Sequence, residues 1–269
     1  IYYKSACYQQ TLKNNPEFVK KYWEIGQLRS PEFAVIGVNK GGTTSLYGYL
    51  IQHPQVIAPI KKEMDFWSWK FNDSINWYKS HFPPIPEGVN FVTGEASPSY
   101  FDYREAPSRL FNAFPKVKLI LLLRNPVDRA VSQYHHCIRL NWDNRQMEEV
   151  FNSDLEKLIA GKIDLWRKEL NYLARGVYVE FVREWLRVFP REQLLVLKSE
   201  EFYQNTAASM EKVLAFLGLP VHRLREYETF NPGKYPPISE SMRRRLSDFF
   251  QPYNRRLEEY LEMKFNWDN

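Results

Sequence analysis

The chain has 269 residues, a normal length for a single α/β unit, and its hydrophobic content of 44% is enough for a sizeable core. The net charge of +5 fits an anionic ligand and equally an ordinary soluble surface, and no apolar run approaches the roughly 20 residues that would span a bilayer. The two cysteines, Cys7 and Cys137, argue against a disulfide framework and favour a reducing compartment, so we expect a cytoplasmic location without a membrane segment.

Residues 1–29 differ from the rest and are predicted to form a helical hairpin. Asn15-Pro16 ends a first helix, and Tyr22, Trp23 and Leu28 lie on a second. This pattern resembles the junction between two tetratricopeptide repeats, although one junction cannot build a solenoid. Since the chain begins without Met, we expect a fragment of a longer protein, with repeats upstream that bind a protein partner. A plain hairpin packed on a domain at 30–269 is the alternative.

The stretch 33–50, FAVIGVNKGGTTSLYGYL, predicts a buried strand, a glycine turn and a helix. The turn and the helix start supply groups that bind anions: Lys40, Gly41, Gly42, Thr43, Thr44 and Ser45. Free backbone N–H groups at a helix start, together with a lysine and hydroxyls, favour a phosphate. The lysine precedes the glycine pair, so the pattern is not the Gly-x-x-x-x-Gly-Lys-Ser/Thr loop of nucleotide triphosphatases. A turn without a ligand is the alternative.

A second charged segment, 61–67, contains two lysines and Glu63 between apolar residues. It indicates a charged group partly buried near the anion site, and a solvated charge run is the alternative. Helices are expected over 74–82 and 104–114. A strand over 91–95 leads into Ala96-Ser97-Pro98-Ser99-Tyr100-Phe101.

The most apolar strand, VKLILLL at 117–123, is predicted to be central in the sheet. Asn125 is the expected cap of a helix that starts at Pro126. Arg124 then lies at the carboxyl end of a strand, where open α/β sheets bind ligands. Ser132, about two helical turns along, presents its hydroxyl near the same edge. Together they predict a second anion site.

The remainder of the chain is predicted as helices over 147–160, 165–174, 176–189 and 210–217 and a strand over 193–198. A loop at 231–237 offers Gly233 and Lys234 to a phosphate. Ser239 is the expected cap of the last long helix. The rings of Trp142, Trp166 and Tyr172 are explained more simply by packing than by stacking on a sugar.

These motifs together resemble the sulfotransferases that use 3′-phosphoadenosine 5′-phosphosulfate (PAPS), in motif order from about Pro31 to Asn269. Lys40 to Thr44 is similar to their 5′-phosphosulfate loop, and Arg124 with Ser132 to their 3′-phosphate signature. The resemblance is closest to the heparan-type carbohydrate enzymes, in which a segment similar to 62–67 carries the general base. That group has a lysine where this chain has Ala96, which leaves the acceptor open.

The resemblance implies an α/β, P-loop-like three-layer fold with a central, mostly parallel sheet flanked by helices. It implies transfer of a sulfuryl group from PAPS to a carbohydrate hydroxyl, with Glu63 as the base and Lys40 as the cation at the leaving group. The residues expected at PAPS are Lys40, Gly41, Gly42, Thr43, Thr44, Ser45, Arg124, Ser132, Tyr178, Gly233 and Lys234. Those expected at the acceptor are Lys62, Glu95 and Ser97. No metal is required.

Several alternatives stay open. His135 or His136 could act as the base, although adjacent helix positions diverge and at most one faces the site. The acceptor could be a protein tyrosine or a small-molecule hydroxyl, and no nucleic-acid partner is expected. The alternative location is the Golgi lumen, if the chain is a fragment of a eukaryotic protein. A small-molecule P-loop kinase and a catalytically dead nucleotide-binding module are the candidates from other functional classes.

Overall fold

A computed structural model describes residues 30–72, 74–84, 88, 90–166, 171–227 and 236–267. The hairpin expected at 1–29 lies outside the described residues and stays a prediction, as do the assignments of Gly233 and Lys234.

A parallel four-stranded sheet forms the centre of the fold, in the order β2-β1-β3-β4. The strands are β1 (Phe33–Gly37), β2 (Gly94–Ala96), β3 (Lys118–Leu123) and β4 (Leu194–Lys198). Phe33 of β1 pairs with Gly94 on one side and Lys118 on the other, and Leu119 pairs with Leu194. Every residue of β1 is buried, as expected for a strand covered on both faces. The central place predicted for β3 is confirmed.

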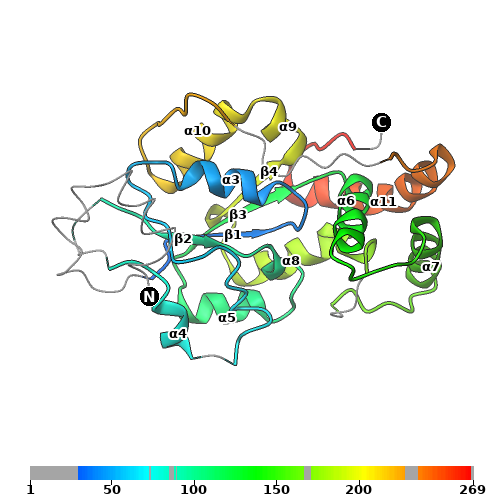
Figure 1. Cartoon of the computed structure of the whole chain (residues 1–269), viewed down its shortest axis with the longest axis horizontal. Coiled ribbons are helices and arrows are strands. Elements are labelled where there is room, and N and C mark those ends of the chain that lie inside the picture. Colours follow the sequence, from blue (N-terminus) through cyan, green and yellow to red (C-terminus); the bar gives the residue numbers. More distant parts are fainter. Residues whose placement is uncertain are drawn as a thin grey trace.

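Helices cover both faces of the sheet (Figure 1). One face packs through Phe33, Val35 and Ile120 against α3 (Thr43–Leu50), α9 (Ser199–Gln204) and α10 (Thr206–Leu217). The other face packs mainly against α5 (Ala106–Ala113), α6 (Pro126–Arg139), α8 (Tyr178–Val188) and α11 (Glu240–Leu261). Alternate residues of β1, β3 and β4 therefore lie in different cores. The predicted three-layer α/β architecture is confirmed.

The remaining elements are short or peripheral: α4 (Ile75–Lys79), α7 (Met147–Ile159) and the 3₁₀ turns η2 (Pro98–Tyr100), η3 (Ala174–Gly176) and η4 (Arg191–Gln193). Asn125 caps α6 as predicted, because its side-chain oxygen accepts from the N–H groups of Val127 at 3.0 Å and Asp128 at 3.3 Å. Ser239 likewise caps α11 through the N–H of Met242.

Within the described part of the chain, every helix is too short or too polar to cross a bilayer.

The helix expected over 165–174 is wrong. Around the undescribed residues 167–170, the chain forms turns and then η3. Side chains accept hydrogen bonds from the backbone N–H groups there. The Asp154 carboxyl group accepts from the N–H of Tyr172 at 3.0 Å, and the Asn171 side-chain oxygen accepts from the N–H of Ala174 at 2.9 Å. These bonds compete with the helical ladder, so the turn conformation is preferred.

Candidate active site

A cavity of about 1000 Å³ lies at the carboxyl ends of all four strands. Each strand is followed closely by a lining residue: Arg124 and Ser199 come directly after β3 and β4, and Pro98 and Lys40 come shortly after β2 and β1. Open parallel sheets bind ligands at this edge. The two anion sites predicted from separate stretches of sequence thus border one cavity.

The predicted phosphate cradle is the turn between β1 and α3. Lys40 and Gly42 have positive φ angles of 70° and 102°, and Gly42 is the N-cap of α3. Since glycine has no side chain to cap the helix, the first backbone N–H groups of α3 have no side-chain cap at the edge of the cavity. Thr43 and Ser45 are buried and line the cavity, as does half-buried Thr44.

Neighbouring elements fix the shape of this cradle. The Ser199 hydroxyl donates to the Gly41 carbonyl at 2.7 Å, and the Tyr203 hydroxyl lies 3.4 Å from the Ser45 hydroxyl. A Cβ at Gly41 would lie 2.7 Å from the Leu122 carbonyl oxygen of β3, so the turn packs directly on the sheet. Gly41 itself is buried behind the cavity lining.

Arg124 connects the cradle with the second anion site. Its guanidinium donates to the Lys40 carbonyl at 3.2 Å, and its own carbonyl accepts from the Tyr178 hydroxyl at 2.8 Å. Tyr178 is buried and lies outside the lining, so it supports Arg124 from behind. Ser132 of α6 lines the cavity with Arg124, as the sequence predicts.

The positive charges of the cavity act on Lys40. Burial lowers the pKa of the Lys40 ammonium, and repulsion by the Arg139 and Arg124 guanidiniums lowers it further. A site that gathers cations in this way favours an anionic ligand, which would relieve the repulsion.

Glu63 borders the same cavity from the segment before β2. Its side chain is 54% exposed, forms an ion pair with Lys62, and sits on a residue with φ of 60° whose N–H donates to the Ala96 carbonyl at 3.0 Å. Asp65 also lines the cavity, and burial raises the pKa of its carboxyl group. The predicted base is thus a solvent-accessible carboxylate facing the cavity.

Glu95 and Ser97, predicted at the acceptor, are both fully buried and lie outside the cavity lining. The Glu95 carboxyl group accepts hydrogen bonds from the hydroxyls of Tyr78 at 2.6 Å, Tyr100 at 2.8 Å and Ser97 at 2.7 Å. The Ser97 hydroxyl oxygen in turn accepts from the N–H of Asp65 at 3.1 Å. These contacts hold the segment that carries Glu63, instead of reaching the cavity themselves.

Of the two candidate histidines, His136 lines the cavity and His135 does not. Burial lowers the pKa of the His136 imidazole, and the positive charges of Lys40 and Arg139 lower it further. The prediction that at most one of the adjacent pair faces the site is therefore confirmed. No group of His, Cys, Asp and Glu in the described ranges could hold a metal ion.

Sequence reasoning missed several lining residues, namely Arg139, Arg175, Glu200 and Tyr203. They come from the end of α6, from η3 and from α9, and none belongs to a compact motif. The start of α9 directly after β4 is the one signal that could have found Glu200 and Tyr203, because the residues after a parallel strand lie at the ligand edge.

The sulfotransferase domain family model matches residues 30–253. The chain belongs to this family. It is 30% identical to the mouse heparan sulfate glucosamine 3-O-sulfotransferase 3A1, with 90% of this chain and 66% of that protein covered. It is 31% identical to the human bifunctional heparan sulfate N-deacetylase/N-sulfotransferase 3, with 87% of this chain and 30% of that protein covered.

Among solved structures, a sulfotransferase from Alicyclobacillus acidocaldarius aligns with a TM-score of 0.73 and 31% identity, covering 90% of this chain and all of that one. The chain spans about two thirds of the length of the mouse relative. The sulfotransferase domain and its three-layer fold are therefore shared with these proteins.

Proposed function

We propose that the chain transfers a sulfuryl group from PAPS to a carbohydrate hydroxyl and releases adenosine 3′,5′-bisphosphate. The proposal rests on one observation: the two predicted anion sites line the same cavity, and Glu63 lines it too. One anion site is the β1–α3 turn, and the other is Arg124 with Ser132. A nucleotide with two separated phosphates matches this arrangement better than a nucleotide triphosphate, which needs one continuous phosphate cradle.

The residues of the chain fit PAPS. The start of α3, which has no side-chain cap, suits the 5′-phosphosulfate. Glycine at position 42 leaves room for Tyr203, because a Cβ there would lie 2.8 Å from its hydroxyl. PAPS, when bound, supplies a sulfuryl group attached to a phosphate leaving group. Lys40 would neutralise negative charge at the bridging oxygen, and Arg124 with Ser132 would hold the 3′-phosphate.

Glu63 is the proposed general base. Its carboxylate is accessible from the cavity, and its backbone N–H bonds to Ala96 at the end of β2, so it can accept the proton of an incoming hydroxyl. Lys62 pairs with it and, 21% exposed, is proposed to orient it, while Glu95, Ser97 and Tyr178 are proposed as positioning residues.

The carbohydrate acceptor rests on the relatives, whose names specify heparan sulfate as their substrate. A tyrosine or small-molecule hydroxyl is the alternative acceptor. The compartment, cytoplasm or Golgi lumen, and a protein partner bound through upstream repeats stay predictions.

The substitution Glu63→Gln tests this function. We expect the variant to lose sulfuryl transfer from PAPS to a heparan sulfate oligosaccharide by about 10²-fold or more, because removal of a general base costs that much. Affinity for adenosine 3′,5′-bisphosphate, measured by calorimetry, should stay unchanged.

Glu156→Gln is the matched control, because Glu156 is an exposed carboxylate of α7 outside the cavity lining. Equal turnover by Glu63→Gln and wild type would reject Glu63 as the base and favour His136 in that role. Hydrolysis of Mg-ATP without any turnover of PAPS would instead favour the kinase.

A further inference from the structure

Trp142 is an exposed indole on the wall of the cavity. It lines the cavity, yet 63% of its surface is exposed. The sequence predicts that three rings, those of Trp142, Trp166 and Tyr172, pack against the protein. Tyr172 does so and is fully buried, and Trp166 contacts Phe181 with ring centroids 4.9 Å apart. Trp142 differs from both, because an indole of this size is normally covered by other apolar groups.

The backbone before Trp142 is fixed. After α6 ends, Asn141 adopts a left-handed conformation with φ of 57°, and its N–H donates to the Ile138 carbonyl at 3.0 Å. The Trp142 N–H donates to the Cys137 carbonyl at 2.9 Å. Cys137 is 1% exposed, so this anchor lies in the core.

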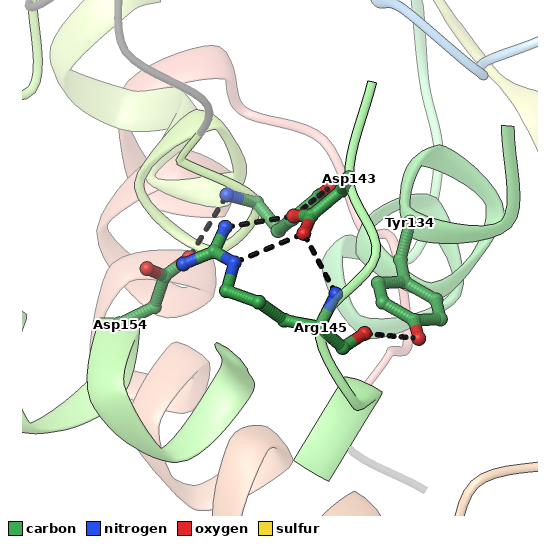
Figure 2. A network of polar contacts seen from close by, with 5 residues as sticks. Tyr134, Asp143, Arg145 and Asp154 are labelled. Carbon is green, nitrogen blue, oxygen red and sulfur yellow. Dashed lines mark hydrogen bonds and ion pairs between the residues drawn. The ribbon is translucent and has the colours of Figure 1, made fainter. Parts of the chain in front are cut away.

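The backbone after Trp142 is fixed by a buried carboxylate (Figure 2). Asp143 accepts from Arg145 through its backbone N–H at 3.1 Å, Nε at 2.9 Å and Nη2 at 2.7 Å, and from the Tyr172 hydroxyl at 2.9 Å. The Arg145 hydrogen bonds hold the pKa of the Asp143 carboxyl well below its usual range. The Arg145 carbonyl also accepts from the Tyr134 hydroxyl at 2.8 Å.

Most of the Trp142 surface is uncovered, since 63% of it is exposed. Its contact with His136 is edge-on, with ring centroids 6.0 Å apart and planes at 82°. One small ring in this geometry covers little of an indole face. A rigid backbone that presents an open aromatic face to a cavity is the arrangement of a preorganised stacking surface, because little freedom is lost when a ring binds.

We propose that Trp142 is the platform of an acceptor subsite, on which the apolar C–H face of a sugar ring stacks. The contacts of Asp143 with Arg145 and Tyr172 form its anchor and act as a positioning device. This inference rests on the proposed carbohydrate acceptor. Trp142 would set the affinity for the sugar and take no part in proton transfer or nucleotide binding.

Steady-state kinetics with PAPS and a heparan sulfate oligosaccharide test the platform. Trp142→Ala should raise the KM for the oligosaccharide about tenfold, while kcat and the affinity for adenosine 3′,5′-bisphosphate change less than twofold. Trp142→Phe, which keeps a ring, should recover most of the loss. Tyr260→Ala, which removes a 44% exposed aromatic outside the cavity lining, is the matched control and should resemble wild type.

An oligosaccharide KM within twofold of wild type for Trp142→Ala would overturn the inference and leave the proposed function intact. An equal loss of nucleotide affinity would also overturn it, because Trp142 would then belong to the nucleotide site. Failure of the wild-type protein to transfer to any saccharide would reject the acceptor class and the platform together.

A double-mutant cycle tests whether the anchor acts through Trp142. Asp143→Asn should raise the oligosaccharide KM several-fold in the wild-type background and add less than twofold in the Trp142→Ala background, since both changes remove the same contact. Arg145→Gln, at a side chain that is 45% exposed, tests the same anchor if Asp143→Asn does not fold. Full additivity of the two changes would show that the network is only structural.

Discussion

At the scale of single residues, the phosphate cradle depends on a position that only glycine fills well. Gly42 combines a φ of 102° with a lack of room, because a Cβ there would lie 2.8 Å from the Tyr203 hydroxyl. Gly161 has a φ of 63°, and a Cβ there would have nothing within 4 Å. Gly161 therefore represents a left-handed backbone in open space, whereas Gly42 adds crowding and a φ beyond the left-handed region that alanine tolerates.

We predict that Gly42→Ala weakens the binding of adenosine 3′,5′-bisphosphate about tenfold or more, because alanine is strained at this φ and its Cβ would displace the Tyr203 hydroxyl beside the turn. Gly161→Ala should destabilise the chain by about 1 kcal/mol and leave binding unchanged. Calorimetric titration and denaturant unfolding of both variants measure these effects. Indistinguishable nucleotide affinities for the two variants would argue against a phosphate at the turn.

At the scale of elements, the segment that carries Glu63 is held on β2 by the buried Glu95 carboxyl group. Burial raises the pKa of Glu95 to about 7 from its ordinary 4.5, although hydrogen bonds from Ser97, Tyr78 and Tyr100 oppose the change. The folded chain therefore binds this proton more tightly than the unfolded chain does. Its contribution to stability is complete below pH 4.5, falls as the pH rises, and is lost above pH 7.

The pKa difference corresponds to about 3 kcal/mol. We predict that the free energy of unfolding of wild type, relative to that of Glu95→Gln, falls by about this amount between pH 4.5 and pH 8, because glutamine cannot titrate. Urea unfolding at several pH values in this range measures the difference and removes the contribution of other groups. Parallel pH profiles for the two proteins would mean that Glu95 titrates normally.

The sequence predicts an element well when neighbouring residues determine it, and poorly when distant residues do. The cradle and the Asn125 cap were predictable because consecutive residues build them. The placement of Glu95 was not, since its motif specifies a residue type and leaves open whether the side chain faces the cavity or the core. The turns near Tyr172 depend on Asp154, which lies 18 residues away, so helical periodicity alone predicted the wrong structure.

At the scale of the whole molecule, the cavity depends on the parallel sheet, which brings the ends of four distant strands together. Lys40 and Arg124 are 84 positions apart, yet the Arg124 guanidinium bonds the Lys40 carbonyl. Of the long-range arrangement, the sequence predicted the order of motifs and the ligand edge. It did not predict Arg139 and Tyr203, which reach the cavity only through the packing of α6 and α9.

A ligand that joins the two anion sites should stabilise the whole fold. We predict that adenosine 3′,5′-bisphosphate at 100 times its Kd stabilises the protein by about 2.7 kcal/mol, or roughly 5–10 °C in Tm. Adenosine 5′-monophosphate at the same concentration should give a much smaller shift, because it lacks the phosphate assigned to Arg124 and Ser132. Thermal unfolding with each nucleotide measures both shifts.

Arg124→Ala should reduce the shift with the bisphosphate to that with the monophosphate, while Arg183→Ala, at an exposed arginine of α8, should leave both shifts unchanged. Equal shifts with the two nucleotides in wild type would contradict a second phosphate site. A fall in the monophosphate shift as well would mean that Arg124 acts on the cradle through the Lys40 carbonyl, and the 3′-phosphate contact would then have to come from other residues of the cavity.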